Sequence, residues 1–154
     1  MSVELSAVPP ADAASGSRLA HFPVALFSTV MGMAGLTLAW LKAQHVGGAP
    51  GLPGEALRWA ASGLYLFLLA VYALKIVRHP GEVAAERRHP VRLNFFPAIS
   101  IGLLLLATAW AAAAPGAAQW MWGVGAAMHL AFTLWAMSSW IHHTHYDIKH
   151  ANPA

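Results

Sequence analysis

The sequence predicts an all-α membrane protein with four transmembrane helices. Of its 154 residues, 58% are hydrophobic and only 10% are charged, whereas about 25% of residues in soluble domains are charged. The mean hydropathy is +0.53. The uncharged residues also form runs long enough to cross a bilayer core of about 30 Å. This composition argues against an ordinary soluble enzyme and excludes a disordered chain, which would be rich in charge.

The chain is expected to open with a tail and a first span. Residues 1–20 are mostly small and polar, so we expect a flexible tail. The uncharged run between Arg18 and Lys42 holds a first span at residues 23–41. Small residues recur on one face of this span at intervals of three and four, namely Ala25, Ser28, Gly32 and Gly35. Such a stripe either lets another helix approach closely or forms part of a pore wall.

A second span is expected at residues 56–77. It follows a segment rich in Gly and Pro, residues 43–54, which predicts a loop. Arg58 and Lys75 lie near the two ends of the span. We expect these long side chains to extend to the membrane interface, where their charges stay hydrated.

Two further spans are expected in the C-terminal half. An uncharged run that begins at Leu93 is too long for one span and long enough for two. Pro115 and Gly116 divide this run, because proline cannot continue helical hydrogen bonding. The third span is therefore predicted at residues 95–114 and the fourth at residues 119–141. Tryptophans near the span ends are typical of the aromatic belts at membrane interfaces.

The distribution of basic residues predicts the orientation. Residues 78–94, between the second and third spans, hold Arg78, Arg87, Arg88 and Arg92, and Lys75 lies just before them. The positive-inside rule places this segment in the cytoplasm, together with the N-terminus and the residues after Ile141. The bases are scattered, so the sequence gives no sign of nucleic-acid binding. The chain has no cysteine, which excludes disulfides and thiolate metal sites.

The histidines that follow the last span offer a weak metal signal. His142, His143, His145 and His150 cluster there, beside Asp147. His142 and His145 are three positions apart and could share a helical face. Histidine is ordinary at a membrane interface, so we expect no metal site and no cofactor.

His129 lies deep in the fourth span and has two interpretations. The first is a hydrogen bond to a neighbouring helix. The second is an axial ligand of haem, which would make the protein a four-helix haem-binding electron-transfer subunit. A small membrane scaffold without a transport role is a third hypothesis for the whole chain.

The most distinctive segment joins the basic loop to the third span. It reads His89-Pro90-Val91-Arg92-Leu93-Asn94-Phe95-Phe96, a basic lip followed by an aromatic helix start. This run resembles the HPVR-x-NFF signature of the slow-type anion channels of plant guard cells. Their bacterial relatives form the tellurite-resistance and C4-dicarboxylate transporter family. Residues 22–36 also resemble that family's first helix, and residues 151–154 resemble the start of a later motif.

The resemblance covers residues 21–154 and implies a larger architecture. Family members have ten transmembrane helices, arranged as five hairpins around a central pore, and are usually homo-trimers. The odd-numbered helices line the pore, so the first and third spans here would be inner helices. We therefore expect this chain to be the N-terminal part of a longer protein, with its two hairpins forming part of the pore bundle.

The resemblance also implies the function, which is passive transport of small anions such as chloride, nitrate or C4-dicarboxylates across a bacterial plasma membrane. No covalent chemistry is expected. The candidate pore-lining residues are Ser28, Gly32, Gly35, Asn94, Phe95 and Phe96. The candidate basic cytoplasmic mouth, which would raise the local anion concentration, consists of Arg87, Arg88 and Arg92.

Overall fold

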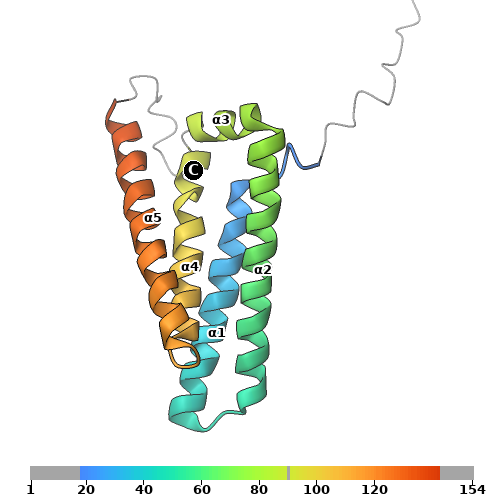
Figure 1. Ribbon diagram of the computed structural model, residues 1–154, viewed down its shortest axis with the longest axis vertical. Helices are drawn as coiled ribbons and strands as arrows, with labels where there is room; N and C mark the ends of the chain where they lie inside the picture. The colour runs from blue at the N-terminus through green and yellow to red at the C-terminus, as the bar shows by residue number, and fades with distance from the viewer. Residues whose placement is uncertain (1–17, 90, 143–154) are drawn as a thin grey trace, which may run out of the picture.

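The computed structural model describes residues 18–89 and 91–142. These residues form helices and turns, with no strand among them (Figure 1). The helical elements are η2 (Val24–Leu26), α1 (Phe27–Gly47), α2 (Gly51–Arg78), α3 (Pro80–Arg88), η3 (Arg92–Phe95), α4 (Pro97–Trp110) and α5 (Pro115–His142). Most of the predicted tail, and the histidines after position 142, lie outside the described residues.

The predicted number of spans is confirmed. Four helical segments are long and apolar enough to cross a membrane, namely Val24–Gly47, Gly51–Arg78, Arg92–Trp110 and Pro115–Ile141. The protein is therefore an all-α, multi-pass membrane protein. The span boundaries differ from the prediction at several ends, and each difference has a local cause.

The connection between α1 and α2 is much shorter than the predicted loop at residues 43–54. Helix α1 continues to Gly47, and α2 already begins at Gly51. Gly48 ends α1 in the left-handed region, with φ at 67°, where glycine has no steric penalty. The Gln44 side-chain amide then donates to the carbonyls of Pro50 and Gly51, at 2.8 and 2.7 Å. These bonds stabilise a short turn. The glycines on either side of it therefore belong to the two helices and not to a long loop.

The segment predicted as a cytoplasmic loop contains a helix of its own, α3. Pro80 stands in its first turn, where the missing N–H costs no hydrogen bond. Glu82 lies in the first turn and two arginines lie in the last turn, so the charges complement the helix dipole. Helix α3 runs across one end of the bundle, roughly perpendicular to the long helices (Figure 1). We call this end of the molecule the α3 end.

The turn between α4 and α5 also differs from the prediction. Helix α4 ends at Trp110, before the predicted limit of 114, and α5 begins at Pro115, before the predicted start at 119. Proline cannot continue a helix, but its fixed φ suits the first turn of a new one. Pro115 therefore opens α5 rather than lying in the loop.

Helices α1 and α4 occupy the middle of the bundle. Helix α4 packs against α5 on one side and against α1 on the other, and α1 packs in turn against α2. In the apolar stretch of the third span, which contains α4, 50% of the residues are buried. In the apolar stretch of α5, only 6% are buried. The core between them is closed by apolar and aromatic side chains, namely Val24, Phe27, Val30, Ala34, Ala61, Tyr65, Leu68, Tyr72, Phe96, Ile99 and Leu106.

The expectation that Arg58 and Lys75 extend to the interface is wrong, because both side chains are buried against other helices. Arg58 forms an ion pair with Glu55 and donates to the carbonyl of Ala109 at 3.4 Å. Its guanidinium also lies 4.5 Å from the ring centre of Trp110. These partners come from α4 as well as α2, so the charge is partnered inside the protein, although the buried Nε of Arg58 has no hydrogen-bond partner among the described residues.

Candidate functional site

The small-residue stripe of α1 is not covered by any helix that the structure describes. Ser28, Gly32 and Gly35 are exposed. A β-carbon added at Gly32 or Gly35 would meet no atom of another described element within 4 Å. The opposite face of α1 carries the buried residues Phe27 and Val30. Within the described helices, the stripe therefore does not serve as a helix-packing surface, and it leaves an open face of small residues.

The hydroxyl groups on this face are bonded to their own helix. Ser28 Oγ donates to the carbonyl of Ala25 at 2.7 Å, and Thr29 Oγ1 donates to the carbonyl of Leu26 at 2.6 Å. Each hydroxyl proton thus has a partner without another helix. Between Ser28 and Gly35 the open face of α1 is consequently polar in places but carries no formal charge.

A pocket of about 370 Å³ lies where α1 begins, at the α3 end. Its lining includes Ala25, which is also the first residue of the small-residue stripe. Arg92 and Phe95 line it from η3, and Glu82 and Glu86 line it from α3. The pocket therefore joins the aromatic and basic start of the third span to the open face of α1.

Glu86 is the centre of a buried polar network beside this pocket. Its Oε1 accepts a hydrogen bond from Lys75 Nζ at 2.8 Å, and its Oε2 accepts one from the Tyr72 hydroxyl at 3.0 Å. Lys75 Nζ also donates to the carbonyl of Phe22 at 2.7 Å. The network connects α2, α3 and the segment before α1. It compensates the Glu86 charge, which leaves Arg92 and Glu82 as the opposed formal charges of the pocket.

Comparisons with known proteins agree with the architecture. Residues 21–154 match the family described as voltage-dependent anion channel. The chain belongs to this family. It is 31% identical over 84 residues to the tellurite resistance protein TehA homolog of Haemophilus influenzae, which covers 54% of this chain and 26% of that protein. It is 31% identical over 97 residues to the S-type anion channel SLAH3 of Arabidopsis thaliana, covering 58% and 15% of the two chains.

The matched region thus spans about a quarter of the Haemophilus protein and less of the Arabidopsis channel. The resemblance noted from the His89–Phe96 run is confirmed at the level of the family. In this member of the voltage-dependent anion channel family, the candidate functional residues are those that the four described spans leave open on one side of the bundle.

The structure brings together only part of the predicted site. Arg92 and Phe95 lie at the pocket that adjoins the α1 stripe. Phe96, by contrast, is 6% exposed and packs edge-on against Tyr72 and Trp135 in the core. A side chain buried between α2, α4 and α5 does not line the open face of α1, so Phe96 is better described as a core residue.

Asn94 and two of the predicted arginines also lie apart from the stripe. Asn94 Oδ1 accepts a hydrogen bond from Trp140 Nε1 of α5 at 3.3 Å. Arg87 and Arg88 line a second pocket, together with Trp135. On α3, Arg87 and Arg88 follow Ala84 by three and four positions, on the face opposite Glu82 and Glu86. The structure therefore places Arg87 and Arg88 of α3 at one pocket and Arg92 of η3 at another.

Several residues of this region were not predicted as a site. The sequence predicts Lys75 only as a charge near a span end, and it singles out neither Glu86 nor Tyr72. Their connection depends on α3 folding back over α2. No spacing in the sequence indicates that return, since nine helical residues had been expected as loop.

The prediction of an interhelical hydrogen bond for His129 is confirmed. Its Nδ1 lies 3.1 Å from Ser100 Oγ of α4. Ser100 Oγ already donates to the carbonyl of Pro97 at 2.8 Å, so His129 Nδ1 is the donor toward it. This contact explains a histidine within the fourth span without a cofactor.

Proposed function

We propose that the protein passes small anions across the membrane, and that the open face of α1 forms part of the pathway wall. The observation that carries the proposal is the uncovered stripe of Ser28, Gly32 and Gly35, which leads from the pocket at the α3 end. Membership of the voltage-dependent anion channel family and the two relatives support anion transport in general.

The chemistry of the stripe suits an anion that must enter and leave quickly. Glycines leave room for a hydrated ion and add no charge that would trap it. Ser28 supplies a hydroxyl that donates to a passing anion once it turns away from the Ala25 carbonyl. Because donors of this kind are weak and neutral, they favour passage over tight binding.

Arg92 is proposed as the basic residue of the pathway mouth, with Phe95 beside it. Its positive charge raises the concentration of anions at the pocket, an effect that salt screens. Glu82 lines the same pocket and opposes this effect. Glu86 contributes little, since Lys75 compensates its charge.

The finer features are proposed on the same basis. Chloride, nitrate or C4-dicarboxylates are the proposed substrates, and transport is passive, without covalent chemistry. The α3 end is proposed as the cytoplasmic end, because most basic residues lie there. Assembly as a homo-trimer in the plasma membrane, with α1 and α4 as inner helices, follows the family's architecture.

The wall is tested by anion flux in liposomes that contain the protein at the full length encoded by its gene. Gly32→Leu and Gly35→Leu should reduce chloride efflux at least about tenfold, since a branched side chain would narrow the pathway. Gly63→Leu is the matched control. Gly63 is an exposed glycine of α2, and a β-carbon added there would also meet no atom of another described element within 4 Å. If all three variants have equal flux, the α1 stripe is not the wall.

The mouth is tested by neutralising its two opposed charges separately. Arg92→Gln should lower chloride flux at low ionic strength, and Glu82→Gln should raise it. Both effects should diminish as the salt concentration increases, because the Debye length shortens. Flux changes of the same sign in the two variants would contradict an electrostatic role for this pocket.

A further inference from the structure

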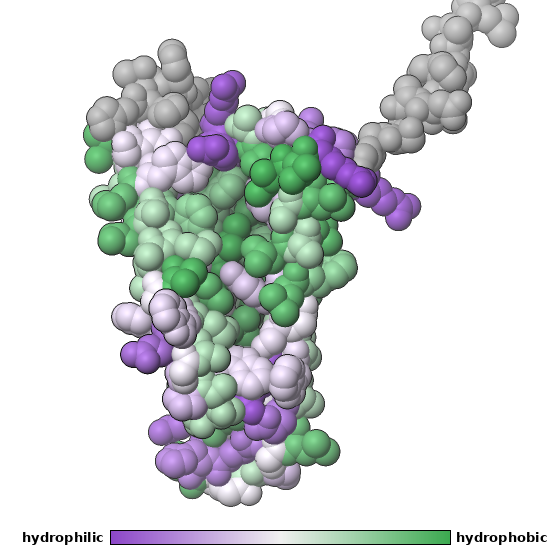
Figure 2. Space-filling view, viewed as in Figure 1, coloured by the Kyte–Doolittle hydropathy of each residue, from purple (hydrophilic) through white to green (hydrophobic). Residues whose placement is uncertain are grey.

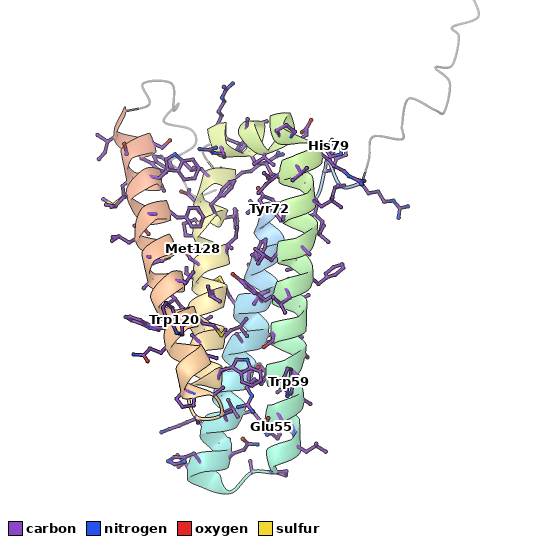
Figure 3. The ribbon with its side chains drawn as sticks, viewed as in Figure 1. Glu55, Trp59, Tyr72, His79, Trp120 and Met128 are labelled. Carbon is purple, nitrogen blue, oxygen red and sulfur yellow. The ribbon has the colours of Figure 1, made fainter. Side chains whose placement is uncertain are left out.

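A second open region of the molecule lies between α2 and α5, away from the α1 stripe. Here a groove of about 580 Å³ runs along the spans. Its walls are apolar and aromatic, and include Leu69, Ile76, Ile99, Met128, Phe132 and Trp135. Tyr72 of α2 and Met128 of α5 lie on its two sides (Figure 3). Apolar side chains gather over this part of the surface, toward the α3 end (Figure 2).

The groove ends beneath two arginines of α3. Arg87 lines the groove itself and also a smaller pocket of about 330 Å³, in which it is joined by Arg88. Trp135 borders both spaces. An apolar space within the spans thus adjoins a basic space at their end, and Arg87 and Trp135 border both.

The two arginines lack anionic partners in the part of the chain that the structure describes. The ion pairs found there are Arg58 with Glu55 and Lys75 with Glu86. The Arg87 guanidinium instead lies over the Trp135 ring, 5.1 Å from its centre. This cation–π contact orients the guanidinium at the top of the groove while its N–H donors stay available to an oxyanion.

We propose that this groove binds one anionic phospholipid of the adjacent leaflet. One acyl chain occupies the apolar groove between α2 and α5, and the lipid phosphate contacts Arg87 and Arg88. The volume lies within the range of about 300–1,000 Å³ that is usual for small-molecule sites. Basic pockets between transmembrane helices are typical binding sites for anionic lipid headgroups. The groove lies along helices that are long and apolar enough to cross a membrane.

The site differs from the proposed anion pathway in position and chemistry. The pathway follows the uncharged Ser28–Gly35 stretch of α1, whereas the lipid site lies between α2 and α5 and combines apolar walls with two cations. The proposal therefore does not depend on which anion the protein transports. Lipid binding is a role that agrees with the position of Arg87 and Arg88 on α3. A mouth shared with Arg92 agrees less well with that position.

The test is native mass spectrometry of the full-length protein, released from nanodiscs that contain phosphatidylglycerol or phosphatidylcholine with identical acyl chains. One phosphatidylglycerol per chain should be retained in preference to phosphatidylcholine. Arg87→Gln should weaken this retention about fivefold, the effect of one interfacial charge. Arg78→Gln is the matched control, because Arg78 is an exposed arginine at the same end of the bundle that lines neither space.

A second pair of variants tests the acyl-chain part. Ala131→Trp adds a large side chain to the groove wall and should reduce retention of both lipids, whereas Ala127→Trp, on the exposed surface one turn away, should not. Thermal unfolding of each variant shows whether the fold is intact. Equal retention of the two lipids, or equal effects of Arg87→Gln and Arg78→Gln, would overturn the proposal. So would a dimer mass that disappears in Ala131→Trp, since a second copy would then fill the groove.

Discussion

Lys75 Nζ of α2 lies 2.8 Å from Glu86 Oε1 of α3, and the two side chains are 1% and 5% exposed. Glu86 also accepts a hydrogen bond from the Tyr72 hydroxyl, and Lys75 also donates one to the Phe22 carbonyl. Every strong hydrogen-bonding group of the pair thus has a partner inside the protein. The pair attaches α3 to the end of the bundle and brings its Glu82 face toward the start of α1 and its arginines toward α5.

Removal of one member of this pair should be strongly destabilising. Lys75→Met leaves Glu86 buried without its cation, so we expect the free energy of unfolding to fall by about 3–5 kcal/mol. The measurement is unfolding by a denaturing detergent in mixed micelles, followed by tryptophan fluorescence. Lys42→Met, which changes an exposed lysine of α1, should alter stability by no more than about 0.5 kcal/mol. Equal stabilities of the two variants would contradict the network.

Phe96 should contribute to stability rather than to the transport pathway. Phe96→Ala removes a ring that packs against Tyr72, Phe132 and Trp135, so unfolding should be easier by about 3–5 kcal/mol. Phe67→Ala is the matched control on α2, because Phe67 is 61% exposed and should cost much less. If Phe96→Ala changes anion flux but not unfolding, Phe96 belongs to the pathway after all.

Substitution by alanine should have opposite effects on stability at two glycines. At Gly54 a β-carbon would lie 2.9 Å from the Gln44 amide, which is held by its bonds to Pro50 and Gly51. Gly54→Ala should therefore destabilise the α1–α2 hairpin by about 1–3 kcal/mol. Gly32→Ala has open space and should stabilise α1 by up to about 1 kcal/mol through helix propensity. The thermal unfolding midpoints of the two variants check this, and a lower midpoint for Gly32→Ala would show that its face is covered.

The Ser100–His129 contact should couple α4 and α5 only modestly. A double-mutant cycle with Ser100→Ala and His129→Ala should give a coupling energy of about 0.6 kcal/mol, the average for hydrogen bonds between membrane helices. The cycle is measured by the same detergent-induced unfolding. A coupling energy of zero would mean that the two side chains do not interact in the membrane.

Much of the fold was predictable because bilayer physics acts on local composition. Long uncharged runs indicate helices wherever they occur, and all four spans were confirmed. Boundaries were less predictable, because Gly and Pro have several roles. Helix α5 begins at Pro115, although the sequence predicts this proline in the loop before the helix. The hydrogen bond of the Gln44 side chain stabilises a turn that is shorter than the loop predicted from the glycine content.

The candidate site was predictable only in part. The regular spacing of Ser28, Gly32 and Gly35 placed them on one face of α1, as any helix requires. Their exposure was not predictable, since it depends on which side of α1 its neighbours cover. Arg87 and Arg88 line one pocket and Arg92 lines another, a division that the sequence does not indicate because it predicts a loop where α3 forms.

Local sequence thus established the membrane class, the number of spans, the family motif and the helical face that carries the small residues. These properties depend on hydropathy and on helical periodicity, which act within a few turns of chain. The partners of Arg58, Lys75 and Glu86, and the groove between α2 and α5, came from the packing of distant segments. A buried charge requires a partner at bonding distance, and only the folded arrangement brings Glu86 to Lys75.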